Sequence, residues 1–151
     1  MQPIIATIKA AKRKAFLKTK PMYDVSAPVT EEELARVTSK LGATLPAEVS
    51  ESLLALGYGT LNDQFNISRD WWNVLDRGEL AGHVVFAQDE SGNLYTLSLG
   101  NGDVHFIDRF AKTYAWLAGN FIAFLEEASS RGFQIMQWSE SQPQRPYDTG
   151  A

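Results

Sequence analysis

The chain of 151 residues contains no cysteine. This absence excludes disulfide bonds, thiolate metal sites and cysteine nucleophiles, and it is typical of a reducing compartment. Long apolar runs are also missing, since none reaches the roughly 20 residues of a membrane-spanning helix. The first 20 residues lack both an uninterrupted apolar core and a small-residue cleavage site, so they do not predict a secretory signal. We therefore expect a cytoplasmic protein with no membrane partner.

Residues that carry chemistry are equally scarce. The chain has two histidines, His83 and His105, and no G-x-S-x-G sequence that would indicate a serine nucleophile. The glycines at 57–59 do not open a helix after a strand, so they predict a turn and not a phosphate-binding loop. Near His105 lie carboxylates without the spacing of a metal site: Asp89, Glu90, Asp103 and Asp108. We predict no enzymatic activity, no cofactor and no metal.

Positive charge is concentrated at the start of a chain whose formal net charge is −4. Residues 1–20 hold six basic residues and no acidic one. The other eight of the 14 basic residues and all 18 acidic residues follow, which gives the remainder a formal charge of −10. This asymmetry predicts a basic arm on an acidic body.

The arm carries apolar residues at helical spacing and so predicts an amphipathic helix; they are Ile4, Ile8, Ala11, Ala15 and Phe16. Three interpretations compete. The helix could pack its apolar stripe on the domain with its lysines in water, contact an acidic partner or nucleic acid, or lie on a membrane. The membrane interpretation is least favoured because few large apolar side chains are available to insert. Residues 21–28, with proline at both ends, read as a connector.

Two helices are predicted after this connector. Thr30 and Glu33 form the two halves of a capping box, and Gly42 ends the helix. The three glutamates of its first turn complement the helix dipole, which explains them without a functional acidic site. The second helix begins near Pro46, where a missing N–H costs nothing, and stops at Gly57.

The centre of the chain, residues 83–108, reads as three short apolar strands separated by two turns. Asn101-Gly102 favours a two-residue turn, because both residues tolerate positive φ. Such a turn places Leu97 opposite Phe106. It sorts the side chains onto two faces, one with Leu97, Leu99, Val104 and Phe106 and the other with Thr96, Ser98, His105 and Ile107. We predict an antiparallel meander at the centre of its sheet.

The first turn of the meander, residues 89–93, is longer. If all five residues form it, Val85 lies opposite Leu97 and joins the core face. A slip of one residue would instead turn Val84 and Phe86 toward the core. In either register both faces of strand 84–87 are apolar, so something must cover the second face.

The segments on either side of the meander are predicted as follows. A short strand at 66–67 precedes a helix at 69–75, in which one of Trp71 and Trp72 is core and its neighbour is partly exposed. After a loop at 109–113, a helix capped by Asn120 ends at Gly132, and an apolar run at 133–136 reads as an edge strand. Residues 138–151 are predicted to be a polar, disordered tail. The predicted organisation is a basic arm (1–20), one domain (21–137) and this tail.

An ordered series of features in this chain resembles the SUKH superfamily. The series comprises a capped helix, Leu-Gly-x-x-Leu-Pro-x-Glu at 41–48, a glycine turn at 57–59, Asp-x-x-Gly-Asn at 89–93, Leu-Tyr-x-Leu, Val-His-Phe and a final Asn-Phe-x-x-Phe-Leu helix. The resemblance spans about Val29 to Gly132. Two departures are the missing Asn-Gly-Gly at the glycine turn and the individual segment 70–78 with its paired tryptophans. The superfamily includes fungal Smi/Knr-type regulators and many bacterial toxin-immunity proteins.

The resemblance implies an α+β fold, a single domain with an antiparallel sheet and helices packed around it. It also implies a protein that binds and neutralises a cognate toxin, often a nuclease. Because a nuclease is basic where it holds phosphate, acids of the individual segment and the adjoining turn are predicted to form the contact patch. The predicted partner-binding residues are Asp63, Asp70, Trp71, Trp72, Asp76, Glu79, Asp89 and Glu90. The alternatives are a regulatory adaptor that binds cellular proteins and, less favoured, nucleic-acid binding through the arm.

Overall fold

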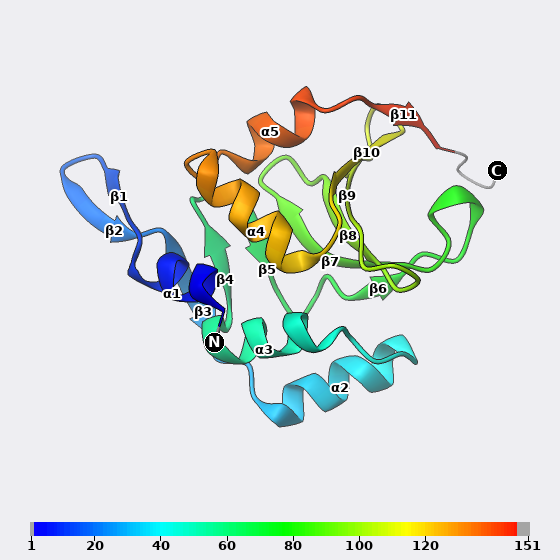
Figure 1. The fold of residues 1–151 in the computed structure, drawn as a ribbon, viewed down its shortest axis with the longest axis horizontal. Helices are drawn as coiled ribbons and strands as arrows, with labels where there is room; N and C mark the ends of the chain where they lie inside the picture. Colours follow the sequence, from blue (N-terminus) through cyan, green and yellow to red (C-terminus); the bar gives the residue numbers. More distant parts are fainter. Residues whose placement is uncertain (1, 148–151) are drawn as a thin grey trace.

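The computed structural model describes residues 2–147, and these form one α+β domain (Figure 1). Its main sheet is antiparallel, with strands in the order β11-β10-β9-β8-β7-β5-β4-β3 and β6 beside β7. The strands are β3 (Tyr23–Ala27), β4 (Tyr58–Leu61), β5 (Phe65–Ile67), β6 (Asn73–Val74), β7 (His83–Asp89), β8 (Leu94–Ser98), β9 (Val104–Asp108), β10 (Thr113–Ala118) and β11 (Arg145–Pro146). A separate hairpin is formed by β1 (Lys12–Ala15) and β2 (Lys18–Pro21).

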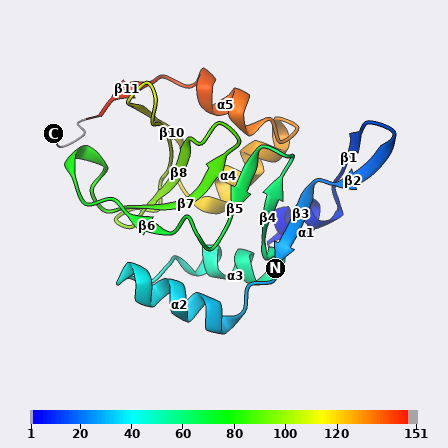
Figure 2. The ribbon, with the colours of Figure 1, turned by 180° about the vertical axis from the view of Figure 1, so that it is seen from behind.

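The helices lie against the inner face and at both ends of this curved sheet (Figures 1 and 2). They are α1 (Pro3–Ala10), α2 (Glu31–Leu41), α3 (Ala47–Leu56), α4 (Phe121–Ser130) and α5 (Ile135–Ser141), with a short 3-10 turn at Gly78–Leu80. In both views α4 lies across β5 and β7, α5 runs beside one end of the sheet, and α2 and α3 lie at the other end (Figures 1 and 2). One apolar core joins all five helices to the sheet.

The local helix signals are confirmed. The Thr30 hydroxyl accepts the Glu33 N–H at 3.1 Å, and Gly42 adopts a left-handed φ of 67° after α2. Asn120 accepts the Ala123 N–H at 2.7 Å and so caps α4. These caps act within a few residues of the chain, which is why the sequence alone reveals them.

The meander is confirmed and central, but its second turn is longer than predicted. Leu97 lies opposite Val104 and not Phe106, so the register is shifted by two residues. The Ser98 N–H donates to the Asp103 carbonyl at 2.8 Å, which leaves a four-residue loop, and only Gly102 of the Asn-Gly pair has positive φ. A shift of two keeps every side chain on its predicted face.

The first hairpin begins in the predicted register and then loses it. Gln88 pairs with Leu94 next to the turn, as expected for a five-residue turn, but a bulge at Phe86 shifts the pairing by one. Val84 therefore lies opposite Leu97, and both Val84 and Phe86 are in the core. Of the two registers left open, the slipped one holds beyond the bulge, with Val84 and Phe86 and not Val85 on the core face, because a bulge inserts one unpaired residue and exchanges the faces beyond it.

The predictions for residues 11–28 and 57–75 need correction. The arm is helical only through Ala10, since residues 12–21 form the β1–β2 hairpin, and the predicted connector contains β3. Gly57 ends α3 with a φ of 79°, as predicted, but Tyr58 and Gly59 begin β4. A Cβ on Gly59 would lie 2.5 Å from the Asp24 carbonyl oxygen, so glycine is needed at this position for close approach of β3. The predicted helix 69–75 is a turn followed by β6, while strand 66–67 is confirmed as part of β5.

The predicted edge strand and tail are also wrong. Residues 135–141 form α5, and Trp138 stacks on Phe124 with ring centroids 5.4 Å apart. Arg145 and Pro146 then pair with β10, a strand that was not predicted. The buried tryptophan anchors a polar segment whose composition alone indicates disorder. The remainder of the predicted tail, residues 148–151, lies outside the described residues.

Candidate partner-binding surface

The predicted acidic residues do not form one patch. Asp63 and Glu90 lie close together, because the Glu90 N–H donates to the carbonyl of Gln64 at 3.0 Å. Asp63 is paired with Arg13 of the hairpin at 2.9 Å, so its carboxylate already has a partner within the chain. This first group lies at the Asp89 end of β7.

A second group lies at the opposite end of the same strand. Asp76 and Glu79 are exposed in the loop after β6, whose Leu75 N–H donates to the His83 carbonyl at 2.8 Å. The seven residues of β7 separate the two groups by about 20 Å at a rise of about 3.3 Å per residue. Asp70 is exposed in the turn between β5 and β6 and belongs to neither end.

Two predicted residues are buried. Asp89 accepts the N–H groups of Ser91 and Asn93 at 2.9 and 3.1 Å and so shapes the β7–β8 turn; burial raises its pKa. Trp72 is only 1% exposed and donates its indole N–H to the Tyr58 hydroxyl at 3.0 Å. Trp71 is half-buried, and its indole N–H is held by Asn66 at 2.7 Å. One tryptophan is therefore core and its neighbour partly exposed, as predicted.

Glu33 is the centre of a polar cluster that links α2 to the sheet. Its carboxylate accepts two hydrogen bonds from Arg36, at 2.7 and 2.8 Å, and one from the Tyr58 hydroxyl at 2.7 Å. The hydrogen bonds from Arg36, assisted by that from Tyr58, lower the pKa of Glu33 to about 2. Arg69 approaches the same carboxylate at 3.9 Å. These contacts give the cluster a structural role, which the helix-dipole explanation did not anticipate.

The outer face of the sheet carries aromatic residues that the sequence reasoning missed. Trp116 pairs with His105 across β9 and β10, and Tyr114 lies on the same face. The centroid of the His105 ring is 5.0 Å from the centroid of the His83 ring and 5.9 Å from that of the Tyr114 ring. Trp116 is 54% exposed, which is unusual for so large an apolar side chain. We call this set, His83, His105, Tyr114 and Trp116, the aromatic face.

The alternation in residues 113–118 is the signal that reveals this face. Thr-Tyr-Ala-Trp-Leu-Ala, between a turn and a capped helix, is typical of a strand. The small and apolar residues Ala115 and Leu117 are buried, and the residues between them point outward. Pairing with β9 then places Tyr114 and Trp116 beside His105.

The aromatic face is neutral and bordered by acids. Burial lowers the pKa of His83, and burial together with the neighbouring His83 lowers that of His105, so both rings are uncharged near pH 7. The Nδ1 atom of His105 is buried without a hydrogen-bond partner in the described part of the chain. Asp103 acts electrostatically on both histidines, and the loop with Asp76 and Glu79 adjoins the His83 end of β7.

The histidines are not arranged for nucleophilic catalysis. His83 Nδ1 lies 3.1 Å from the Thr96 hydroxyl, but Thr96 is fully buried and out of reach of a substrate. Residues 2–147 contain no group of three or more histidine or carboxylate side chains placed to hold a metal ion. Within the same range, every helix is too short or too polar to cross a membrane.

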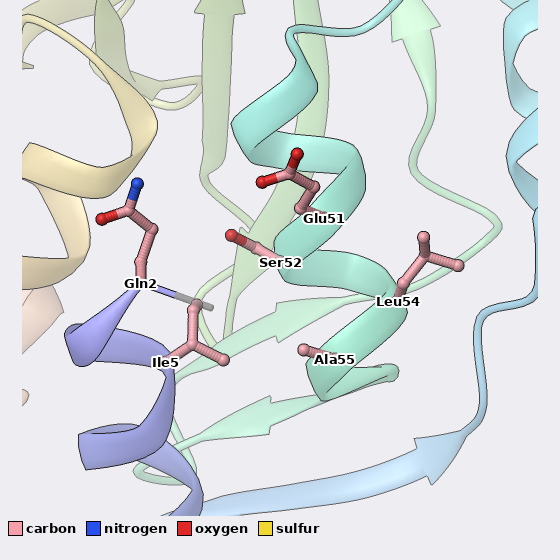
Figure 3. Close-up of a pocket in the computed structure, with 6 residues that line it drawn as sticks. All are labelled: Gln2, Ile5, Glu51, Ser52, Leu54 and Ala55. Atoms are coloured by element: carbon pink, nitrogen blue, oxygen red, sulfur yellow. The ribbon is translucent and has the colours of Figure 1, made fainter.

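A surface pocket of about 360 Å³ opens between α1 and α3 (Figure 3). Ile5 of α1 and the preceding Gln2 line one side of it, and Glu51, Ser52, Leu54 and Ala55 of α3 line the other. The Ser52 hydroxyl at its edge donates to the Glu48 carbonyl at 2.6 Å, so it is already engaged in a hydrogen bond within the helix. The lining is suited to an apolar group next to a positive charge.

One comparison with known proteins gives a match. The family model described as SMI1 / KNR4 family (SUKH-1) matches residues 28–127, which is most of the domain and includes α2 through β10. Neither a curated protein nor a solved structure matches the chain significantly. The matched range leaves out α1, the β1–β2 hairpin and α5.

Proposed function

The chain belongs to the SMI1 / KNR4 family (SUKH-1), and from that membership we propose that it is a non-enzymatic immunity protein. It binds a cognate protein toxin of a polymorphic or contact-dependent system in the cytoplasm of a bacterium and neutralises it by occlusion. The family includes toxin-immunity proteins. A nuclease is the toxin class that best suits the acidic body, because a nuclease is basic where it holds phosphate.

The aromatic face is the surface that best supports this role. Interfaces are enriched in tryptophan and tyrosine at their desolvated centres, and charged residues at the rim steer the encounter. Trp116 offers an exposed anchor beside half-buried Tyr114. Exposed Asp76 and Glu79 adjoin this face, whereas Asp63 and Glu90 lie at the far end of β7. The exposure of Trp116 on a face whose His83 end adjoins these acids is the observation that carries the choice of surface.

The first experiment identifies the toxin and tests neutralisation. A gene encoding a large protein with a variable C-terminal domain is expected directly upstream of the gene for this chain. Co-expression should protect cells from that C-terminal domain, and the purified pair should form a one-to-one complex. Growth arrest despite co-expression, or the absence of a complex, refutes the proposal. If the chain instead captures host regulatory proteins with comparable affinity, it acts as an adaptor.

The second experiment tests the surface with matched variants. Trp116→Ala should weaken toxin binding by about 30-fold or more, the effect of removing an anchor worth about 2 kcal/mol. Trp71→Ala is the control, since that half-buried side chain is hydrogen-bonded to Asn66 of β5, a strand that contributes no residue to the aromatic face. The double variant Asp76→Lys/Glu79→Lys should slow association in low salt by about tenfold. If Asp63→Lys/Glu90→Lys alone has this effect, the contact lies at the other end of the sheet.

A further inference from the structure

The β1–β2 hairpin exposes two large apolar side chains at its tip. Phe16 is 100% exposed and Leu17 is 90% exposed. The hairpin projects from the body in both views, and its two strands pair only with each other (Figures 1 and 2). A two-stranded hairpin gains little stability by itself in water, and an exposed aromatic tip gains none from the core. The tip is therefore placed for contact with a partner.

The base of the hairpin is held firmly against the body. Arg13 is paired with Asp63 at 2.9 Å, and the Met22 N–H donates to the Ala11 carbonyl at 2.9 Å. The preceding helix α1 buries Ile5 and Ile8 in the core. The hairpin is thus presented in a fixed direction, with its tip about 13 Å from the base if each of four residues rises about 3.3 Å.

The positive charges beside the tip indicate which kind of partner it binds. Both faces of the hairpin carry exposed lysines, namely Lys12, Lys14, Lys18 and Lys20. A membrane or a nucleic acid would attract these lysines but would be repelled by the remainder of the chain, which has a formal charge of −10. A second copy of this chain offers the lysines carboxylates on its acidic body, so the attraction is local, between the hairpin of each copy and the body of the other.

The body also offers an acceptor for the tip. The pocket between α1 and α3 shares Glu51 and Leu54 with a second pocket of about 430 Å³ between α2 and α3. We call these two adjoining pockets the α1–α2–α3 groove; its accessible apolar side chain is Leu54, which is 38% exposed, while Ile5 and Leu34 line it but are nearly buried. Glu51 lines both pockets, the first of which is drawn in Figure 3, and Glu31 lines the second, so carboxylates lie beside the apolar lining.

We propose that the Phe16–Leu17 tip of one copy docks in the α1–α2–α3 groove of a second copy, and that the exchange is reciprocal. The apolar side chains of the tip pack in the groove, and the flanking lysines lie beside the carboxylates of Glu31 and Glu51. Reciprocal docking closes a two-fold dimer, whereas one-way docking would build an open chain. Each contact buries a small area, but the dimer contains two of them, and both contribute to its stability. The groove and the aromatic face use different elements, so the second copy and the toxin do not compete for one surface.

A charge exchange tests the pairing. Lys14→Glu/Lys18→Glu makes the tip flanks negative, and Glu31→Lys/Glu51→Lys makes the groove positive. Each variant alone should be monomeric by light scattering, with at least a tenfold weaker dimer than the original chain. Mixed in equal amounts, they should form a one-to-one dimer, because both reciprocal contacts then join opposite charges. Combining all four changes in one chain should restore the homodimer.

Matched controls separate these contacts from general charge effects. Lys112→Glu and Glu126→Lys reverse exposed charges outside the hairpin and groove and should leave the dimer intact. Phe16→Ser/Leu17→Ser should abolish the dimer without changing the thermal midpoint, since both side chains are in water in the monomer. A chain that is monomeric at all soluble concentrations overturns the proposal. So does a dimer that survives the tip change, or a mixture that stays monomeric.

Binding to other anionic partners is decided in the same samples. Vesicles with phosphatidylserine and a duplex oligonucleotide should bind the original chain no better than the Phe16→Ser/Leu17→Ser variant. Tip-dependent binding to either, by a chain that remains monomeric, assigns the hairpin to that partner and overturns self-docking.

Discussion

Glu33 shows at the residue scale how one side chain can serve both a local signal and the tertiary fold. Its backbone N–H completes the cap at Thr30, as its position in the sequence predicts. Its carboxylate, however, turns toward Arg36 and Tyr58, and these hydrogen bonds lower its pKa to about 2 from an ordinary value of 4.5. A carboxylate with a lowered pKa contributes stability above its unfolded pKa and loses it as the pH falls toward the folded value.

Glu33→Gln is therefore expected to destabilise the protein at neutral pH by about 1–3 kcal/mol, the cost of losing charged hydrogen bonds at a partly buried site. The difference from the original chain should shrink between pH 4.5 and about 2, as Glu33 becomes protonated. Urea unfolding at a series of pH values measures this. The exposed neighbour Glu32, changed to Gln, is the control and should show no such pH-dependent difference. A constant difference across the range would contradict the assigned pKa.

Gly59 is the second residue whose replacement has a clear physical consequence. An added Cβ would lie 2.5 Å from the Asp24 carbonyl oxygen and 2.9 Å from the Tyr23 ring, so β3 must move away. Gly59→Ala should cost about 1–3 kcal/mol, the usual range for overpacking. Gly119→Ala is the matched control, because a Cβ there meets no atom within 4 Å. Equal midpoints for the two variants in thermal unfolding would show that β3 can move away from the added Cβ without loss of stability.

At the scale of elements, the sequence predicts helices whose caps lie within a few residues. It does not predict strands and bulges that depend on tertiary contacts. Thr30, Gly42 and Asn120 act on groups within four residues, so α2 and α4 were predicted. Half of the residues of strands β1 and β2 are lysine, and the strands show no apolar alternation, because neither face of the hairpin is buried in the core. The bulge at Phe86 depends on packing across strands and has no signature in the sequence.

The candidate site was predicted in part for the same reason. The acids were expected to gather because they are close in sequence, yet β7 separates Glu79 from Glu90. The aromatic face was missed because residues 113–118 received no assignment, although their alternation is typical of a strand. The buried member of the Trp71-Trp72 pair cannot be identified from spacing alone, since the predicted helix was a turn.

Helix α5 provides a prediction at this scale. A chain that ends at Gln137 lacks Trp138, whose ring stacks on Phe124 and lies 5.3 Å from the guanidinium carbon of Arg131. It also lacks Ser139, which is hydrogen-bonded to the buried Tyr95 hydroxyl at 3.0 Å. The free energy of unfolding should fall by about 3–5 kcal/mol, as for removal of a core tryptophan. A chain that ends at Tyr147 keeps every described residue after Gln137 and is the control. Equal stability of the two chains would indicate a dispensable tail.

At the scale of the whole molecule, the dominant property is the separation of charge between the hairpin and the body. A basic toxin is attracted by the acidic body and repelled by the hairpin, whereas in a pair of copies the hairpin of each is attracted by the body of the other. The basic residues of the hairpin thus favour the dimer and oppose the approach of a basic toxin. There are five of them: Lys12, Arg13, Lys14, Lys18 and Lys20. Removing the hairpin should therefore weaken the dimer and speed the association with a basic toxin.

Excision of residues 12–21 tests this directly. Ala11 and Met22 are already joined by a hydrogen bond of 2.9 Å, so a Gly-Gly linker can replace the hairpin without moving α1 or β3. Loss of five positive charges changes the formal net charge from −4 to −9. The dimer should disappear, while association with a basic toxin should become faster and more salt-dependent. Stopped-flow association at several salt concentrations, with the thermal midpoint as the check on folding, measures both effects. A folded variant that no longer binds toxin would show that the hairpin belongs to the toxin interface, because removing a repelled segment cannot weaken that complex.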